Sequence, residues 1–388
     1  MDKKQIAFHK THITDDEINL VVEALKSGWT TMGPKTVEFE RLFAEYIFKD
    51  VNSPIVYNTE FIHAVSLNSA TAALHLALKA IGLKAGDEVI LPTNTFVATA
   101  EVVTYFNATP VLCDIEYDTH NMDVSKIEAL ITNRTKAIIP VHFGGQPCDM
   151  DEIKVIASKY NLKVIEDAAH ALPSSYKGKK IGLISDITCF SFYATKTLST
   201  GEGGMAVTNN PEYAKKIRIN RLHGISKDAW DRYSEKGSWY YEVVDNGNKY
   251  NTTDINAALG IAQLKKLEYM RDRRKEIALM YDKAFKENKD IITPVFREDR
   301  ETSWHLYVIK VKNRDQVISK LKELGISTSV HFIPVHKHPY YKETYKYRDS
   351  DYKVANKVFE ESISLPLYPD LSKEDVEYII KKLENVVK

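Results

Sequence analysis

The chain has 388 residues, enough for two or three domains. Apolar residues make up 44% and charged residues 27%, a composition that excludes an intrinsically disordered protein. Lysine and arginine together number 53, as do aspartate and glutamate, so the net charge is zero and argues against a nucleic-acid binder, which needs a basic surplus.

The cysteine content and the N-terminal residues predict the compartment. Cys113, Cys148 and Cys189 are an odd number, too few for a disulfide framework, which fits a reducing environment. The first ten residues, MDKKQIAFHK, lack the apolar core of a secretory signal. No stretch approaches the about 18 consecutive apolar residues of a membrane span. We therefore expect a cytoplasmic protein without a membrane partner.

Two helices are predicted near the N-terminus. Residues 14–17, Thr-Asp-Asp-Glu, match the capping box T-x-x-E, and apolar residues follow at helical spacing from Ile18 to Leu25. Gly28 is a plausible end for this helix. A second helix is predicted over about 36–48, and the polar stretch 49–60 is predicted to be a loop.

From residue 61 onward, short apolar runs alternate with helical patterns, which is typical of an α/β protein with a largely parallel sheet. The runs at 136–141 and 162–167 are nearly continuous, as strands buried on both faces are. From about residue 257 the pattern changes. Residues 255–285 form one long helical pattern, and further strands are predicted at 303–311 and 327–333. This part predicts a second, smaller α+β domain.

Three predicted strand ends carry unusual residues, and in open α/β sheets ligands bind beyond the carboxyl ends of the strands. In LNSAT (67–71), small residues begin a helix whose N-terminus favours an anion. In VIEDAAH (164–170), two carboxylates end a buried strand and need partners. In FSFYATK (190–196), Lys196 follows aromatic residues and precedes GEGG (201–204). Apolar surroundings favour loss of its proton.

Taken singly, each strand end also has an ordinary interpretation: a helix cap, a capping carboxylate, or a surface lysine beside a turn. Together, in this order on one α/β layer, they are what pyridoxal phosphate requires. The helix N-terminus holds the phosphate, and Asp167 pairs with the pyridine nitrogen and keeps it protonated. Lys196 then forms the Schiff base.

Long motifs resemble one known family. The stretches EDAAHALPSSYKGKKIG, FSFYATKTLSTGEGG and KYNTTDINAALG resemble the DegT/DnrJ/EryC1/StrS family of sugar aminotransferases. The resemblance extends from SGWTTMGPK (27–35) to SLPLYPDLS (364–372). It implies the fold of type I pyridoxal-phosphate aminotransferases: a large domain, residues 1–256, with a mostly parallel seven-stranded sheet, and a smaller α+β domain, residues 257–388.

The resemblance also implies roles for cofactor-binding residues. Lys196 corresponds to the Schiff-base lysine and Asp167 to the partner of the pyridine nitrogen, so these two are the predicted catalytic residues. The other predicted contacts are His170 with the cofactor's ring oxygen, Phe96 stacked on the ring, and Ser69, Ala70 and Ser191 at the phosphate. Asn251 is expected to reach the phosphate of the neighbouring subunit, which predicts a homodimer with shared active sites.

Lys35, His331 and His336 lie in segments that face the nucleotide sugar in the family, so we predict them to contact substrate. His331, His336 and His338 are not accompanied by a cysteine or carboxylate constellation, and we predict no metal site. Two stretches depart from the family pattern. Residues 49–60 exceed the family's usual connection, and Asp245-Asn246-Gly247-Asn248 stands where members often have a Pro-Gly turn before Asn251.

The implied activity is transfer of an amino group from L-glutamate to a 4-keto sugar linked to UDP or dTDP, for surface polysaccharide or glycan precursors. The preference for C4 rests on similarity to family members of spore coat polysaccharide biosynthesis and to UDP-4-amino-4-deoxy-L-arabinose aminotransferases. A 3-keto sugar is an alternative. A dehydratase of this fold is less favoured, because the family's dehydratases carry histidine where Lys196 stands. A non-enzymatic DNA-binding regulator is disfavoured by the zero net charge.

Overall fold

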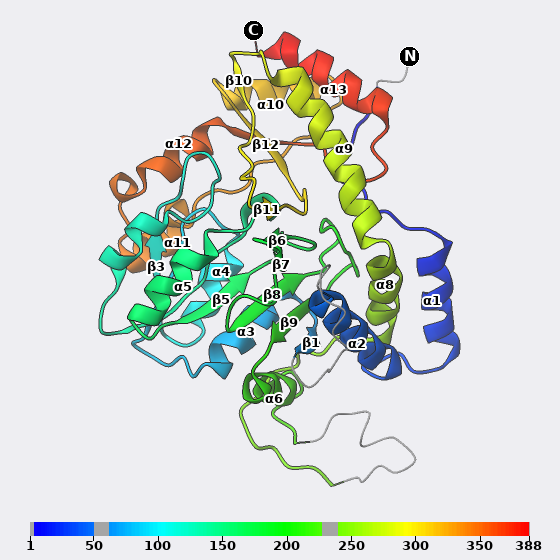
Figure 1. Ribbon diagram of the computed structural model, residues 1–388, viewed down its shortest axis with the longest axis vertical. Helices are drawn as coiled ribbons and strands as arrows, with labels where there is room; N and C mark the ends of the chain where they lie inside the picture. Colours follow the sequence, from blue (N-terminus) through cyan, green and yellow to red (C-terminus); the bar gives the residue numbers. More distant parts are fainter. Residues whose placement is uncertain (1–3, 50–61, 227–239, 388) are drawn as a thin grey trace.

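The computed structural model describes residues 4–49, 62–226 and 240–387 (Figure 1). The predicted loop at 49–60 therefore lies almost entirely outside the described residues. Among the helices of these three ranges, none has both the length and the apolar character needed to cross a membrane.

A seven-stranded sheet forms the centre of the large domain, in the order β1-β9-β8-β5-β4-β2-β3. Strand β9 is antiparallel to both of its neighbours, and the other pairs are parallel. The prediction of a mostly parallel seven-stranded sheet is confirmed. The strands are β1 His63–Leu67, β2 Glu88–Pro92, β3 Thr109–Cys113, β4 Thr135–Ile138, β5 Lys163–Asp167, β8 Ile187–Ser191 and β9 Gly204–Thr208.

Helices cover both faces of this sheet (Figure 1). Side chains alternate along each strand. In β2, Ile90 therefore packs into one core, and its neighbours Val89 and Leu91 pack into the other. The first core contains residues of α2 (Pro34–Phe48), α5 (Met150–Lys159) and α8 (Asp254–Lys265). The second contains residues of α3 (Ala70–Ala80), α4 (Ala98–Thr104) and α6 (Pro211–Asn220).

Helix α1 (Asp15–Lys26) begins with the predicted capping box, and Thr14 is its N-cap. The backbone N–H of Thr14 donates to Glu17 Oε2 at 2.8 Å. Glu17 is fully buried and also accepts bonds from Gln263 and Lys266, so that the cap ties α1 to α8.

The smaller domain is built on an antiparallel sheet of β10 (Ile291–Ile292), β12 (Tyr307–Val311) and β13 (Ser362–Leu365). Its core includes residues of α9, α10 and α13. The helices of this half are α9 Leu267–Phe285, α10 Arg314–Glu323, α11 Pro339–Tyr345, α12 Lys353–Glu361 and α13 Lys373–Val386. A third, small sheet joins the halves through β6 (Ser175–Tyr176), β7 (Lys179–Lys180) and β11 (Arg300–Glu301).

Two predictions for this half were wrong. The long helical pattern at 255–285 is two helices, α8 and α9, which meet at Lys266. Apolar spacing continues across this junction, so the pattern gave no sign of the break. Residues 327–333 do not form a strand, because the segment pairs only through the single bridge Ser329–Ser364. The predicted domain boundary after residue 256 falls inside α8, which packs against α1 and α2.

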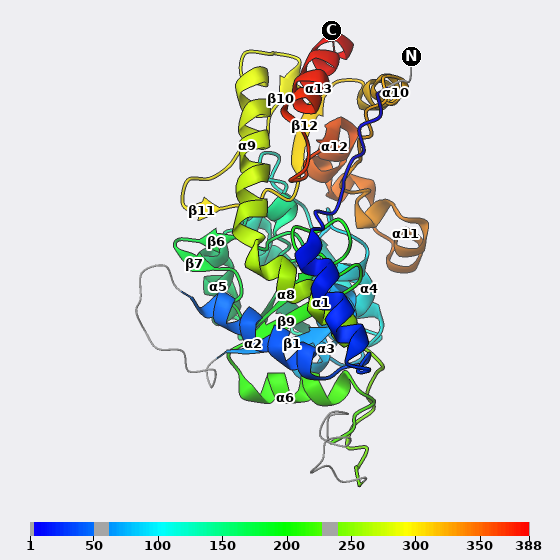
Figure 2. The ribbon, with the colours of Figure 1, turned by 90° about the vertical axis from the view of Figure 1, so that its right-hand side faces the viewer.

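The segment before α1 runs along the smaller domain (Figure 2). Ile6 forms a parallel bridge with Ile326, and the Ile6 N–H donates to Gly325 O at 2.8 Å. The chain then passes the carboxyl ends of the central strands. There His9 Nε2 is 2.9 Å from Ala194 O, two residues before Lys196. The N-terminal segment therefore connects the smaller domain to the loop that carries Lys196.

Candidate active site

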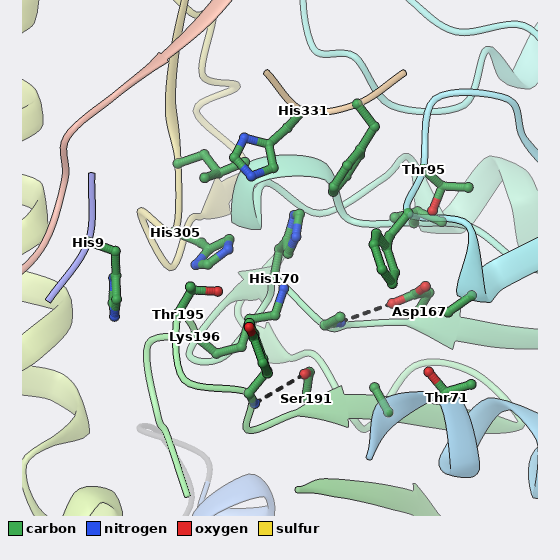
Figure 3. A pocket seen from close by; sticks show the side chains of 18 of the residues that line it. His9, Thr71, Thr95, Asp167, His170, Ser191, Thr195, Lys196, His305 and His331 are labelled. Carbon is green, nitrogen blue, oxygen red and sulfur yellow. Dashed lines mark hydrogen bonds between the residues drawn. The ribbon is translucent and has the colours of Figure 1, made fainter. Parts of the chain in front are cut away.

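A cavity of about 580 Å³ lies at the carboxyl ends of β5 and β8, between the central sheet and the smaller domain. Figure 3 shows Asp167, His170, Ser191, Lys196 and His331 around this cavity, with His305 beside His170. All the predicted cofactor contacts except Asn251 line it: Ser69, Ala70, Phe96, Asp167, His170, Ser191 and Lys196.

Lys196 lies on the loop that follows β8, and it is half-buried. Phe192 N–H donates to Gly203 O at 2.8 Å, and Thr200 N–H donates to Phe192 O at 2.9 Å, so the loop closes against the glycine-rich turn. Burial lowers the pKa of the Lys196 amine to about 8, whereas the negative charge of Asp167 acts in the opposite direction. A neutral amine, the form that attacks a carbonyl, is thus accessible near neutral pH.

The Asp167 carboxylate is held at the end of β5 by two donors. Thr99 Oγ1 on α4 donates to Oδ2 at 2.7 Å, and the Ala169 N–H donates to Oδ1 at 3.1 Å. Burial nevertheless raises the pKa of Asp167. Burial outweighs the hydrogen bonds and charges that lower this pKa, so an ionised Asp167 is favoured by a further cation opposite the carboxylate. A protonated pyridine nitrogen is such a cation.

His170 has a defined proton position. The Gly144 N–H donates to His170 Nδ1 at 3.2 Å, so Nδ1 accepts and the neutral ring carries its proton on Nε2. Burial lowers the pKa of His170 well below its ordinary value, which keeps the ring uncharged. His170 therefore presents an N–H donor, as a contact with an acceptor oxygen of the cofactor requires.

The N-terminus of α3 forms an anion-binding cradle. Ser69 is the N-cap and its Oγ accepts from Ala72 N–H at 3.0 Å. Gly204 on β9 pairs with Leu67 on one side and Ser191 on the other. A Cβ on Gly204 would lie 2.4 Å from the carbonyl atoms of Ser69, so only glycine permits this approach. Ser69, Ala70 and Ser191 are thus brought together where a helix N-terminus favours a phosphate.

Phe96 offers a flat surface in the same cavity. Its side chain is 60% exposed, which is unusual for phenylalanine. Its ring centroid lies 6.0 Å from that of Phe332. The residues present therefore match the parts of pyridoxal phosphate: a phosphate cradle, a ring surface, a carboxylate for the pyridine nitrogen, an N–H donor and an amine.

The predicted substrate contacts are separated by the fold. His331 lines the cavity, with its Nδ1 2.8 Å from Ser364 Oγ, and burial lowers its pKa to about 4. His336 lies outside it, buried between Thr93 Oγ1 at 2.7 Å and Asn356 Oδ1 at 3.0 Å.

Lys35 and Asn251 also lie outside the cavity lining. Lys35 forms ion pairs with Glu23 at 2.9 Å and Glu38 at 3.5 Å. Asn251 Nδ2 donates to Thr252 O, and its buried Oδ1 has no hydrogen-bond partner among the residues that the structure describes. Neither residue contacts the cofactor site of its own chain.

Sequence reasoning missed several residues that line the site or support it. His9 and His305 line the cavity, and the His170 and His305 ring centroids are 4.4 Å apart. Thr95 lines the cavity and is 2.7 Å from Thr99, the donor to Asp167. His9 and His305 are far from the motifs in sequence, and no spacing signal connects them to the strand ends.

The α/β fold and this set of residues define a pyridoxal-phosphate enzyme with the type I aminotransferase fold. A family model described as the DegT/DnrJ/EryC1/StrS aminotransferase family matches residues 11–384. The chain belongs to this family of sugar aminotransferases, and its cofactor is pyridoxal phosphate.

Individual relatives agree with the family. The spore coat polysaccharide biosynthesis protein SpsC of Bacillus subtilis is 49% identical over 97% of this chain and 95% of its own length. An uncharacterized protein of Methanocaldococcus jannaschii is 51% identical over 97% and 96%. The structure of Spr1654 from Streptococcus pneumoniae, described as a sugar aminotransferase in its PMP form, superposes with a TM-score of 0.89, at 38% identity and 99% coverage of both chains. The PLP form of Spr1654 has the same TM-score at 37% identity and 99% coverage of both chains.

Proposed function

We propose that this aminotransferase moves an amino group from L-glutamate to a 4-keto sugar linked to UDP or dTDP. The observation that carries the proposal is the placement of Lys196, Asp167 and His170 around one cavity at the strand ends. The preference for C4 is supported by the similarity to the spore coat protein SpsC. A 3-keto sugar remains the second candidate, since nothing in the cavity separates the two positions.

When bound, pyridoxal phosphate supplies an aldehyde that accepts the amino group and a protonated ring that delocalises electrons from the substrate's α-carbon. Ser69, Ala70 and Ser191 would hold its phosphate, and Phe96 would support its ring. Asp167 would keep the ring nitrogen protonated, and His170 Nε2–H would donate to the ring oxygen.

The Lys196 amine has two tasks in this proposal. Its neutral form binds the aldehyde covalently, and burial makes that form accessible by lowering the pKa to about 8. Once the substrate amine has displaced it, Nζ is free to act as a general base that takes the proton from the substrate's α-carbon. The protonated amine can then act as a general acid that gives this proton up again. A histidine at this position cannot form the covalent bond, so Lys196 supports transamination over dehydration.

We also propose a homodimer with shared active sites in which Asn251 reaches the neighbouring subunit's phosphate. The buried Oδ1 of Asn251, which has no partner within the described ranges of this chain, and its position outside its own chain's cavity support this. On α1, Ile18, Val22 and Leu25 are exposed at helical spacing, and they form an apolar stripe that a partner subunit would cover. We place the enzyme in the cytoplasm, which the three buried free cysteines support.

The test is a panel of UDP-, dTDP- and GDP-linked 4-keto and 3-keto sugars, each incubated with glutamate and the enzyme. Mass spectrometry should detect an amino sugar from a UDP- or dTDP-linked 4-keto substrate. The Lys196→Ala variant is the matched control and should give no product. Amination of 3-keto sugars alone would show that the enzyme aminates C3 and not C4. Absence of any aminated nucleotide sugar would refute the proposed acceptor.

A further inference from the structure

Arg274 on α9 is a buried cation beside the cavity, with only 1% of its side chain exposed. Its Nη1 donates to Leu367 O at 2.6 Å and lies 3.5 Å from His305 O. Within the described part of the chain, its Nε has no acceptor and its guanidinium has no carboxylate partner. Burial of a cation without a counterion is costly, and an anion placed nearby offsets that cost.

The charge of Arg274 reaches the cavity. The two residues whose carbonyls it contacts, Leu367 and His305, both line the cavity. Burial is the main cause that lowers the pKa of His9 to about 4, and Arg274 is the second. Burial and nearby charges, including that of Arg274, also lower the pKa of His305. The positive charge of the Arg274 guanidinium therefore acts electrostatically on the side of the cavity formed by His9 and His305.

Little other positive charge remains there. Among the described lining residues, Lys196 is the only lysine or arginine, and burial lowers the pKa of His9, His170, His305 and His331 so that these rings stay neutral. In the loaded enzyme the Lys196 amine is bound to the cofactor. Burial lowers the pKa of Arg274 only to about 10, so that it stays cationic. Lys35, the predicted cation, lies outside the lining and is paired with Glu23.

We propose that Arg274 is a specificity-determining residue whose charge draws a carboxylate of a dicarboxylic amino donor to the His9–His305 side of the cavity. The inference rests on the proposed donor, L-glutamate, and names the group of this chain that favours a dianion over a monoanion. Arg274 acts through its electric field across the cavity wall, and it is not a catalytic residue.

The test compares two inhibitors that cannot donate an amino group, glutarate, a dianion, and its monoamide glutaramate, a monoanion of similar size. Competition against glutamate in the loaded wild-type enzyme should show a preference for glutarate on the order of tenfold, as a nearby charge at reduced dielectric provides. Arg274→Gln should abolish this preference, and Arg274→Lys should retain most of it. Arg273→Gln, which removes an outward-facing arginine that pairs with Glu276 at the surface, should leave it unchanged.

A structural role alone would not move these ratios, and a second readout follows the charge directly. In Arg274→Gln the pKa of His9, measured by NMR in the cofactor-free protein, should rise. Equal inhibition by the two compounds in the wild type, or loss of the preference in a folded Arg274→Lys variant, would overturn the inference. If Arg274→Gln does not fold, the inhibition ratio in the wild type and that in Arg274→Lys are sufficient to test the inference. Neither involves a sugar, so failure of the proposed acceptor is detected separately.

Discussion

Thr99 Oγ1 donates a 2.7 Å hydrogen bond to Asp167 Oδ2, and this bond links α4 to the carboxylate at the end of β5. Thr99 also lies 2.7 Å from Thr95 Oγ1, whose residue lines the cavity. The carboxylate is thus oriented by an element that comes from a distant part of the chain. Because burial raises the pKa of Asp167, this orientation and the charge opposite it determine whether Asp167 is ionised.

Substitutions at this pair should weaken catalysis in a graded way. Asp167→Asn should retain bound cofactor and lose on the order of 10²-fold or more in turnover, because the proton partner of the ring nitrogen is gone. Thr99→Val should lower turnover by roughly 10- to 10²-fold, in line with ~1.5–3 kcal/mol for a hydrogen bond to a charged group. Steady-state rates with glutamate measure both. Thr104→Val, at the other end of α4, is the control, since the Thr104 hydroxyl donates to Glu101 O within its own helix. Near-wild-type turnover in Asp167→Asn would refute the role.

Lys196 should be the lysine that binds the cofactor covalently. Borohydride reduction of the loaded enzyme, followed by peptide mapping, should place the label on the peptide that contains residues 190–196. Lys196→Ala should bind no cofactor covalently and should lose all measurable activity. A label on a different lysine would refute the assignment of Lys196 as the lysine that binds the cofactor.

The rate of covalent cofactor attachment should depend on pH through Lys196. Burial lowers its pKa to about 8, and below that pH the reactive neutral fraction should grow about tenfold per unit. Stopped-flow absorbance on cofactor-free enzyme should show a rate that rises up to about pH 8 and then levels. Asp167→Asn should move the midpoint to lower pH, because the Asp167 charge raises the pKa of Lys196. A rate still rising steeply above pH 9 would mean an ordinary, solvated lysine.

Shared active sites predict complementation between two defective variants. When Lys196→Ala and Asn251→Ala proteins are mixed and allowed to exchange subunits, one site of each mixed dimer carries both defects and the other carries neither. Statistical exchange into symmetric dimers should restore roughly a quarter of wild-type activity, above the residual activity of either parent. Each variant alone, at the same dilution and in the same buffer as the mixture, is the control. A fully active monomer in light scattering would remove the prediction.

Use of one cavity by both substrates predicts ping-pong kinetics. The keto acid derived from the donor must leave before the keto sugar binds, since both react at Lys196's end of the same cavity. Initial rates at several fixed glutamate concentrations should give parallel double-reciprocal lines. Lines that intersect would show that both substrates are bound together, which contradicts sequential use of the cavity.

The sequence by itself determined the layer architecture and the chemistry at the strand ends. Alternating apolar runs such as 162–167 predict buried parallel strands because local periodicity depends only on neighbouring residues. Asp167 and Lys196 could be singled out for the same reason: Asp167 ends β5 and Lys196 lies on the loop after β8, and these parallel strands end at one edge of the sheet. Gly204 also belongs to a glycine-rich stretch, GEGG, that is recognisable in the sequence. The requirement for glycine, its close approach to Ser69, is visible only in three dimensions.

Only the tertiary structure decided which remote side chains join that edge. His9 reaches Ala194 across 185 residues, and His305 comes from the smaller domain, so neither has a signal in local spacing. Lys35 and His336 were predicted substrate contacts, and in the structure Lys35 forms ion pairs with Glu23 on α1 and Glu38 on α2, whereas His336 is enclosed by hydrogen bonds. Arg274 is one of several basic residues on an amphipathic helix. Its burial, with no carboxylate partner in the described part of the chain, follows from packing against Leu367 and His305, which periodicity does not reveal.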